Sequence, residues 1–227
     1  MNTGLDKRKV FITGASRGIG KKVKEVFEEC GADVIAPGRT ELDLSDRDSI
    51  LNYLKANQTL CPDIFIHCAA INELADIDEL ELKVLDRVFQ VNYYAPVMLL
   101  HHFSKHMKQN RWGRIVFLSS VYAIVSRERR SAYASTKHAL TGLIKTLTLE
   151  LASYHVLTNA VAPGYVMTDM TRKNLSEKEI CDIKKRIPTG RLQTVEDIAN
   201  LTVFLCSDFN QSLTGQLIAV DGGFTCR

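Results

Sequence analysis

Hydrophobic residues in this chain fall into short unbroken runs that alternate with stretches of helical spacing. The runs predict seven strands, at residues 10–12, 34–36, 42–44, 64–66, 115–118, 159–162 and 217–220. Between them, apolar residues recur every three or four positions, the spacing of one helix face, and predict helices that include 79–109 and 133–153. Strands that are apolar throughout are typical of parallel sheets covered by helices on both faces. The pattern therefore predicts one doubly wound α/β domain of Rossmann type over residues 1–227, with a seven-stranded parallel sheet.

Residues that could take part in catalysis or binding gather where predicted strands end. Four of these ends read TGASRGIG, HCAA, SSVYA and APGYVMTDM. In doubly wound folds, ligands bind beyond the carboxyl ends of the strands, so one shared site is expected there. The polar stretch within residues 165–192 is expected to cover the substrate as a lid.

Composition narrows the classes of function. Hydrophobic residues make up 45% and charged residues 24% of the 227 positions, which argues against disorder. A net charge of +3 without a Lys/Arg-rich block argues against a nucleic-acid partner, and no apolar run approaches the ~20 residues of a membrane span. The six cysteines show no CxxC or metal-ligand spacing, and the N-terminus lacks the apolar stretch of a signal peptide. A reduced, cytoplasmic setting without a metal is therefore expected.

The glycine-rich segment TGASRGIG, residues 13–20, lies between the first predicted strand and a helix. Its glycines allow a tight turn and a close approach to a ligand, and the helix N-terminus offers free N–H groups to a phosphate. The spacing differs from the general G-x-G-x-x-G fingerprint, and a merely structural turn is the alternative. The strand–turn–helix context favours dinucleotide binding.

The segment YASTK places Tyr133 and Lys137 four residues apart, on one face of a predicted helix. A phenol has a pKa of about 10, and a nearby ammonium lowers it. The pair is therefore suited to general acid–base work. Taken alone, the same spacing also describes a half-buried helix face with a solvated lysine.

Together, TGASRGIG, YASTK, Ser120, Asn92 and PGYVMTDM resemble the short-chain dehydrogenase/reductase family over almost the whole chain, and in detail its 3-oxoacyl-[acyl-carrier-protein] reductases. The resemblance implies hydride transfer between a nicotinamide cofactor and a carbonyl carbon. It implies that Tyr133 is the general acid or base and that Lys137 lowers the pKa of Tyr133 and holds the nicotinamide ribose. It also implies that Ser120 orients the substrate oxygen and that Asn92 supports a water and proton relay.

Cofactor choice depends on charge near the adenosine ribose. An acidic side chain after the second strand suits NAD, whereas an arginine suits the 2′-phosphate of NADP. The second strand is followed by Arg39 without an acid, and Arg17 adds a second positive charge, so NADP(H) is favoured over NAD(H), with a solvated Arg39 as the alternative. With the resemblance, the expected cofactor contacts are Gly14, Ser16, Arg17, Gly18, Ile19, Gly20, Arg39, Asp43, Leu44, Cys68, Ala69, Ala70, Tyr133, Lys137, Pro163, Gly164, Val166 and Thr168.

The chain departs from the family pattern in three places. HCAA, starting at His67, stands where the family has NNAG, so His67 is either a structural substitute or a functional histidine. The segment GRTELDLSD resembles the sugar-nucleotide-modifying branch of the superfamily, and the few residues between Arg39 and Asp43 predict a more open adenosine pocket. Arg111 matches a carrier-protein docking position, whereas Tyr154 replaces the second docking arginine.

Three arginines, Arg127, Arg129 and Arg130, shortly precede Tyr133. They are interpreted either as an attraction for an acidic substrate or partner, or as a solvated basic loop.

The leading hypothesis is an NADPH-dependent oxidoreductase that reduces a ketone, such as a 3-oxoacyl thioester, to a secondary alcohol. The alternatives are a reductase of a sugar nucleotide or specialised biosynthetic ketone, and a non-catalytic dinucleotide-binding protein. The resemblance further implies a homo-oligomer, a tetramer or dimer, with helices 79–109 and 133–153 at one interface. Whether an acyl carrier protein is a partner stays open. Neither a nucleic acid nor a membrane is expected as a partner.

Overall fold

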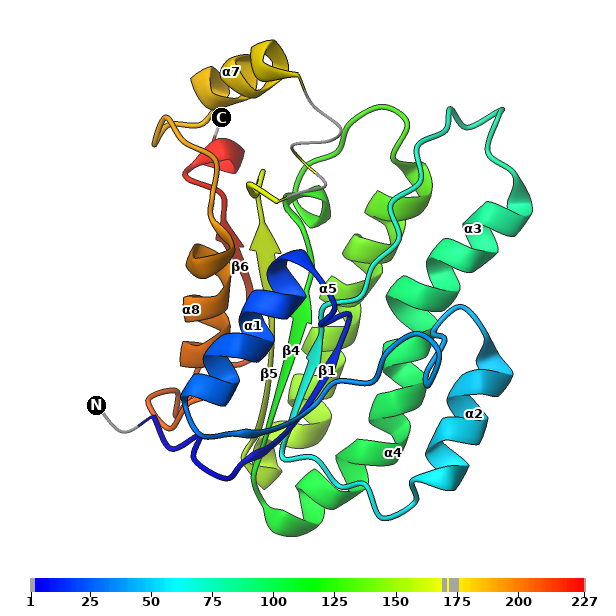
Figure 1. Ribbon diagram of the computed structural model, residues 1–227, viewed down its shortest axis with the longest axis vertical. Coiled ribbons are helices and arrows are strands. Elements are labelled where there is room, and N and C mark those ends of the chain that lie inside the picture. The colour runs from blue at the N-terminus through cyan, green and yellow to red at the C-terminus, as the bar shows by residue number, and fades with distance from the viewer. Residues whose placement is uncertain (1–2, 169–170, 172–175, 227) are drawn as a thin grey trace.

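Six parallel strands form one sheet in the computed structural model, which describes residues 3–168, 171 and 176–226 (Figure 1). The strand order is β2-β1-β3-β4-β5-β6, so β1 lies inside the sheet. The chain adds β2 on one side of β1 and then crosses to add β3 on the other side, and all strands stay parallel. In open α/β sheets such a reversal of strand order marks the ligand-binding crevice. The strands are β1 (Lys9–Thr13), β2 (Asp33–Ile35), β3 (Ile64–His67), β4 (Gly113–Leu118), β5 (Val156–Pro163) and β6 (Leu217–Val220).

The strand predicted at residues 42–44 is not formed, so the prediction of seven strands is wrong. The Leu42 N–H donates to the carbonyl oxygen of Gly38 at 2.9 Å, and the Asp43 N–H donates to Ser49 Oγ at 3.0 Å. Both backbone N–H groups therefore form hydrogen bonds within a local turn, and neither pairs with a neighbouring strand. Leu42 is nevertheless buried in the core, which explains its strand-like apolar signal.

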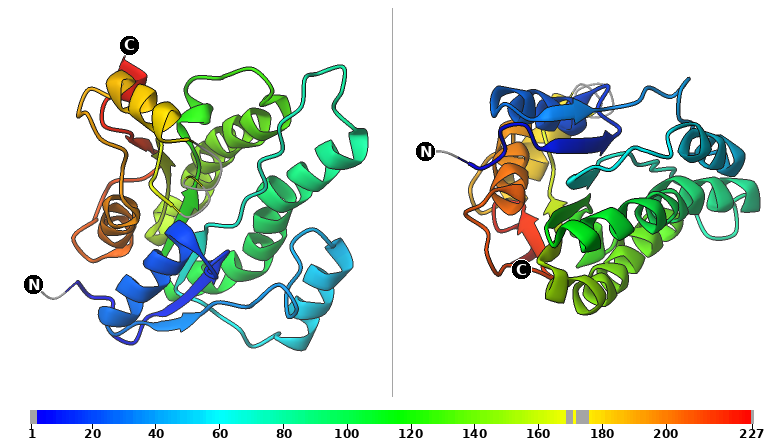
Figure 2. Two further views of the ribbon diagram at one scale, coloured as in Figure 1. Left: turned by 45° about the horizontal axis from the view of Figure 1, so that its top comes forward. Right: turned by 90° about the horizontal axis from the view of Figure 1, so that it is seen from below.

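Alternate side chains of the strands pack into two separate hydrophobic cores, one on each face of the sheet. Phe11 and Phe65 point to one face, which is covered by α2 (Arg47–Ala56), α4 (Ala95–Asn110) and α5 (Ser131–Leu151). Val10 and Ile12 point to the other face, which is covered by α1 (Gly18–Glu29) and α8 (Val195–Cys206). Figure 2 shows these two helical layers on either side of the strands. Burial on both faces accounts for the unbroken apolar runs in the sequence.

The long helix predicted at 79–109 is interrupted before Pro96. It consists of α3 (Leu82–Phe89), a π-helical turn (Gln90–Tyr94) and α4, with Pro96 in the first turn of α4. Proline lacks an N–H and is tolerated at a helix start. The other long predicted helix, 133–153, is α5 followed by a 3₁₀ turn (Ala152–Tyr154).

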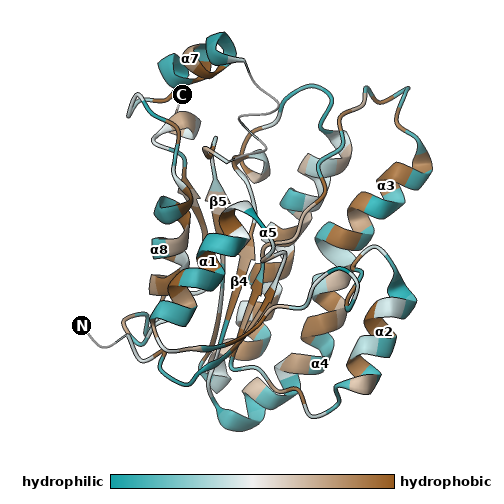
Figure 3. Cartoon of the chain, viewed as in Figure 1, coloured by the Kyte–Doolittle hydropathy of each residue, from teal (hydrophilic) through white to brown (hydrophobic). Residues whose placement is uncertain are grey.

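Helix α7 (Glu177–Arg186) lies beyond the carboxyl ends of the strands (Figure 1). Ser176 and Glu179 form a capping box at its start, and Ile183 anchors it in a small apolar cluster. Much of its surface is hydrophilic (Figure 3). Within the lid predicted at 165–192, residues 169–170 and 172–175 lie outside the described residues, so its covering role stays a prediction. Across the described part of the chain, the helices are too short or too polar to cross a membrane.

Candidate active site

The loops after β1, β3, β4 and β5 meet at one edge of the sheet because the strands are parallel. The Cys68 N–H donates to the carbonyl oxygen of Thr13 at 3.1 Å, which joins the first two loops. The Ser119 N–H donates to the carbonyl oxygen of Val161 at 2.7 Å, which joins β4 to β5. The single shared edge predicted from the sequence is therefore formed.

Two glycines of the loop after β1 are required by close backbone packing. Gly14 has a φ of +71°, and a Cβ atom there would lie 2.6 Å from the backbone nitrogen of Ala69. A Cβ atom at Gly20 would overlap the carbonyl oxygen of Gly14. Gly18, with a φ of +55°, has more room, since its nearest neighbour would be Thr168 Cγ2 at 3.7 Å. A Cβ atom at Gly18 would thus make an ordinary contact with the loop after β5.

The amino-terminal end of α1 is suited to a phosphate. The Arg17 side chain does not cap the helix, and its first turn contains no acidic residue. The free N–H groups and the positive end of the helix dipole favour an anion there. Ser16 and Arg17 are exposed, whereas Ile19 packs into the core and anchors the helix. The observed loop therefore fits the pyrophosphate of a dinucleotide.

The expected adenosine side lies beyond β2. Arg39 is exposed, and its Nε donates to Asp43 Oδ2 at 3.1 Å. Leu44 packs against the core below α2 and α4. Arg39 and Asp43 therefore form one ion pair, whose cation remains accessible to solvent.

Asn92 braces three elements with its side chain. It lies in the π-helical turn and is fully buried. Its Oδ1 accepts from the Ile71 N–H at 2.8 Å, and its Nδ2 donates to the Ile71 carbonyl oxygen at 3.0 Å and to Thr136 Oγ1 at 3.1 Å. Asn92 thus ties the loop after β3 to α5, one helical turn from Tyr133.

Ser120 and Tyr133 lie close together, and Ser120 acts to lower the pKa of Tyr133. Ser120 follows β4, and its Oγ accepts from the Tyr122 N–H at 3.2 Å. Burial raises the pKa of Tyr133 above its usual value of 10.0, while Ser120 and the charge of Arg130 act to lower it. Tyr133 consequently holds its proton at neutral pH.

Lys137 is buried below Tyr133, with its Nζ 5.4 Å from the centre of the tyrosine ring. The ammonium donates to the carbonyl oxygen of Leu118 at 2.8 Å. Burial lowers the pKa of Lys137 to about 8. The ammonium faces β4, and burial has the largest effect on the pKa of Tyr133, so the expectation that Lys137 lowers this pKa stays a prediction.

The loop after β5, expected at the nicotinamide, packs against the C-terminal part of the chain. Pro163 is paired with Val220 in the sheet, and a Cβ atom at Gly164 would lie 2.9 Å from Asp221. Val166 bridges to Gln193, and Thr168 Oγ1 accepts from the Thr171 N–H at 3.2 Å. The loop is thereby held at the same edge as Gly18.

The HCAA segment is braced by a histidine. His67 is fully buried, and its Nδ1 lies 2.8 Å from Thr13 Oγ1. Burial, followed by the charge of Lys137, lowers the pKa of His67 to about 3. Burial also raises the pKa of Cys68 to about 12, so its thiol stays neutral. Ala69 contacts the Gly14 loop, whereas Ala70 is exposed.

Three residues that contact this site, Tyr122, Thr136 and Tyr165, were not among the predicted site residues. Tyr122 lies with its ring centre 6.3 Å from that of Tyr133, and its hydroxyl lies 3.2 Å from that of Tyr165. Thr136 bonds Asn92 and the carbonyl oxygen of Tyr133. Both tyrosines stand inside segments singled out in the sequence, SSVYA and PGYVMTDM, but nothing in spacing indicates that two separate loops bring their hydroxyls together.

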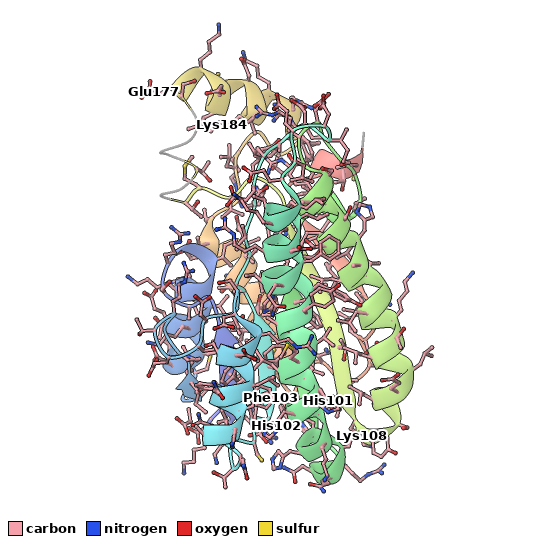
Figure 4. The ribbon with its side chains drawn as sticks, turned by 90° about the vertical axis from the view of Figure 1, so that its right-hand side faces the viewer. His101, His102, Phe103, Lys108, Glu177 and Lys184 are labelled. Atoms are coloured by element: carbon pink, nitrogen blue, oxygen red, sulfur yellow. The ribbon has the colours of Figure 1, made fainter. Side chains whose placement is uncertain are left out.

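The histidines of α4 lie far from this site. His101 and His102 lie near the middle of α4, well below α7 in the view of Figure 4. The described residues contain no group of three or more His, Cys, Asp or Glu side chains that could hold a metal ion.

Comparison with known proteins gives consistent matches. A family model described as enoyl-(acyl carrier protein) reductase matches residues 7–225. The 3-oxoacyl-[acyl-carrier-protein] reductase of Rickettsia felis is 35% identical over 229 residues, which cover 94% of this chain and 95% of that protein.

Solved structures share the whole fold. The gluconate 5-dehydrogenase of Burkholderia cenocepacia in complex with NADP and tartrate has a TM-score of 0.92 at 26% identity, covering 100% of this chain and 98% of that one. A 4-hydroxyisoleucine dehydrogenase complexed with NADH has a TM-score of 0.91 at 27% identity, covering 97% of this chain and 100% of that one.

Proposed function

Because the chain belongs to the short-chain dehydrogenase/reductase family, oxidoreductases that act on CH–OH and C=O groups with NAD(P)(H), we propose that it reduces a ketone to a secondary alcohol with NADPH. The observation that carries this proposal is the phenol of Tyr133 on α5, which lies close to Ser120 beyond the end of β4. Burial raises its pKa, so at neutral pH the side chain is an acid beside the Ser120 hydroxyl. A ketone needs such an acid, whereas the reverse reaction needs the phenolate.

The side chains of the site have distinct parts in the proposed reaction. NADPH, when bound, would supply a hydride with its electron pair for the ketone carbon. Ser120 hydrogen-bonds the ketone oxygen, and Tyr133 donates its proton to that oxygen as negative charge develops there. The resulting phenolate is stabilised by Ser120 and Arg130, the groups that act to lower the pKa of Tyr133. Asn92 and Lys137 hold α5 against β4 and the loop after β3 through their hydrogen bonds.

The preference for NADPH rests on charge. Arg17 and Arg39 are both exposed, and β2 is followed by no acidic residue before Arg39. Arg39 pairs with Asp43, and a 2′-phosphate with its higher charge would compete for the same guanidinium. The relatives named above bind NADP in one case and NADH in another, so comparison of both cofactors is part of the test.

Two substrate classes are supported by different observations. A 3-oxoacyl thioester is favoured by the identity with the Rickettsia felis reductase. A polar, sugar-like ketone is favoured by the gluconate dehydrogenase and by the position of Arg111. Arg111 precedes β4 and donates to the carbonyl oxygen of Ser153 at 3.1 Å, at the edge of the sheet opposite to Ser120. Its contacts lend no support to a carrier protein docked at this chain's own site.

The test is cofactor oxidation by the full chain with NADPH and with NADH, using a 3-oxoacyl thioester and a panel of polar ketones. Tyr133→Phe should lower kcat by about 10²- to 10⁴-fold while NADPH still binds, because only the transferred proton is lost. Tyr53→Phe is the matched control. The Tyr53 ring on α2 packs against Phe11 in the core, away from the site. Unchanged kcat in Tyr133→Phe contradicts the assigned role, and binding of NADPH without turnover of any ketone contradicts the reductase.

A further inference from the structure

Two tyrosines and two arginines gather beside Tyr133, and the proposed proton and hydride transfer leaves most of their polar groups unused. The hydroxyls of Tyr122 and Tyr165 lie 3.2 Å apart, and the guanidinium of Arg130 lies 4.8 Å from the centre of the Tyr122 ring. The hydroxyls of both tyrosines act on the guanidinium of Arg127 and raise its pKa. We refer to Tyr122, Arg127, Arg130 and Tyr165 as the Arg/Tyr cluster.

The cluster is built from three segments that meet only in the folded chain. Tyr122 lies in the 3₁₀ turn (Val121–Ala123) after β4, the arginines precede α5, and Tyr165 follows β5. The Tyr165 ring is fixed against Phe224 at 5.5 Å between ring centres, and the Tyr122 ring stands edge-on to Tyr133. These aromatic contacts hold the two hydroxyls in place next to the proposed acid.

Positive charge in the cluster is only partly neutralised. The carboxylate of Glu128 lies 3.9 Å from Arg127 Nε and is largely exposed, so this pair is weak. Glu179 of α7 also acts on Arg127, but its carboxylate accepts from the Ser176 N–H at 2.8 Å and the Ser176 hydroxyl at 2.7 Å. Within the described part of the chain, no acidic side chain lies within 4.0 Å of Arg130. The tyrosine hydroxyls and the positive charge of the arginines therefore lie together beside Tyr133.

We propose that the Arg/Tyr cluster binds a carboxylate carried by the substrate, so that the protein prefers acidic ketones; this rests on the proposed reductase function. A guanidinium matches the two oxygens of a carboxylate with paired donors, and phenol hydroxyls add further donors. A ketone held by Tyr133 would then carry its carboxylate several bonds away, toward Tyr122. The ketone of a 3-oxoacyl thioester has no anionic group at that place.

The test compares two ketones that differ in one group. 5-Dehydro-D-gluconate carries a carboxylate where L-sorbose carries a CH₂OH group, and both present the same ketone. With NADPH and the full chain, kcat/KM should be higher for the acid. Arg127→Gln should reduce the ratio of the two kcat/KM values by about 10- to 100-fold, mainly through KM of the acid, because a hydrogen-bonded charge pair is lost.

Arg129→Gln is the matched control. It removes the same formal charge two residues away, but the Arg129 side chain points to Asp76, 3.7 Å from its Nε. The control should keep the wild-type ratio. Tyr165→Phe, which retains the ring contact with Phe224, should lower the ratio by a smaller factor. Equal kcat/KM for acid and neutral ketone, or an equal change of the ratio in Arg127→Gln and Arg129→Gln, overturns the proposal.

Binding without turnover separates this proposal from the proposed function. D-Gluconate and D-glucitol differ in the same group and need no reduction, so their effect on the melting temperature reports binding alone. D-Gluconate should raise Tm in the wild type and in Arg129→Gln, but less in Arg127→Gln, whereas D-glucitol should show no such dependence. If no ketone is reduced, the reductase fails while this measurement still decides the carboxylate site. The absence of any Tm difference between the two ligands overturns the site.

Discussion

His67 shows how one buried side chain can replace a family motif. It stands at the end of β3, between the core and the loop that faces Gly14, and its Nδ1 lies 2.8 Å from Thr13 Oγ1. Burial, and then the charge of Lys137, lowers its pKa from 6.5 to about 3. The imidazole is therefore neutral throughout the pH range in which the protein would work. A neutral ring that bonds Thr13 supports the structural interpretation of this histidine.

The lowered pKa of His67 predicts acid sensitivity of the fold. Between pH 6.5 and pH 3 the unfolded chain binds the proton and the folded chain does not, so the stability is complete above pH 6.5 and is lost as pH falls. The loss is about 1.4 kcal/mol per pH unit, or about 2 kcal/mol from pH 7 to pH 5. His67→Asn introduces the asparagine of the family pattern. This variant should lack the part of the pH dependence of the unfolding free energy that is due to His67. Urea unfolding at pH 7, 6 and 5 measures it.

The wild-type chain and His67→Asn share the contribution of all carboxylates, so the difference between their slopes belongs to His67. A lower stability of the variant at every pH would reflect the smaller side chain and leaves the slope difference intact. Parallel slopes in the two proteins would show that His67 titrates normally in the folded state.

At the residue scale, the sequence identified which side chains meet but not how they are charged. Helical spacing predicted that Tyr133 and Lys137 share one face, whereas Ser120 and Asn92 were expected from the resemblance to the family. The direction of the pKa of Tyr133 was not predictable, since it depends on burial by loops that are distant in sequence. The same is true of Tyr122 and Tyr165, whose contact joins the loops after β4 and β5.

At the scale of elements, apolar runs predicted strands correctly wherever the run was flanked by helices. The run at 42–44 failed because Asp43 and Ser45 form a local turn, with the Ser45 N–H donating to Asp43 Oδ1 at 2.9 Å. A buried leucine in a turn gives the same apolar signal as a short strand. The π-helical turn before α4 was likewise hidden, because its residues keep a helical pattern.

The packing of α1 against the loop after β1 predicts a strict need for glycine at position 20. In Gly20→Ala the new methyl group would overlap the carbonyl oxygen of Gly14, so α1 must move away from β1. We expect a lower Tm and at least about a tenfold loss of NADPH affinity, since 1.4 kcal/mol of lost contact energy already gives that factor. Fluorescence titration with NADPH and a thermal melt measure the two effects.

Lys24→Ala is the control for Gly20→Ala. It lies on the same helix, but its side chain is exposed and makes only a surface ion pair with Glu28 at 3.5 Å. Such pairs contribute about 0–1 kcal/mol, so the control should keep its affinity for NADPH. An unchanged NADPH affinity in Gly20→Ala would show that the phosphate does not bind at this helix end.

At the scale of the whole molecule, the outer surface of α5 is the strongest indication of assembly. Leu149 is 87% exposed there, and Gly142, two turns earlier on the same face, has nothing within 4 Å of a Cβ position. A small residue and an exposed leucine on one helix face suit close packing against a second helix. On the adjacent α4, His101 also points outward (Figure 4). We therefore retain the prediction of a homo-oligomer with α4 and α5 at one interface.

Leu149→Arg tests this interface. Burial of a leucine contributes about 1.5–3 kcal/mol, and a symmetric interface contains it twice, so a charged replacement should weaken assembly strongly. Light scattering coupled to size-exclusion chromatography should show an oligomer for the wild type and a smaller species for Leu149→Arg at the same concentration. Leu51→Arg is the matched control, because this leucine is 49% exposed on α2, which is not one of the two helices of the proposed interface. The control should elute as the wild type does. A wild-type monomer, or equal masses for Leu149→Arg and the wild type, would remove α5 from the assembly and leave the site to work within a single chain.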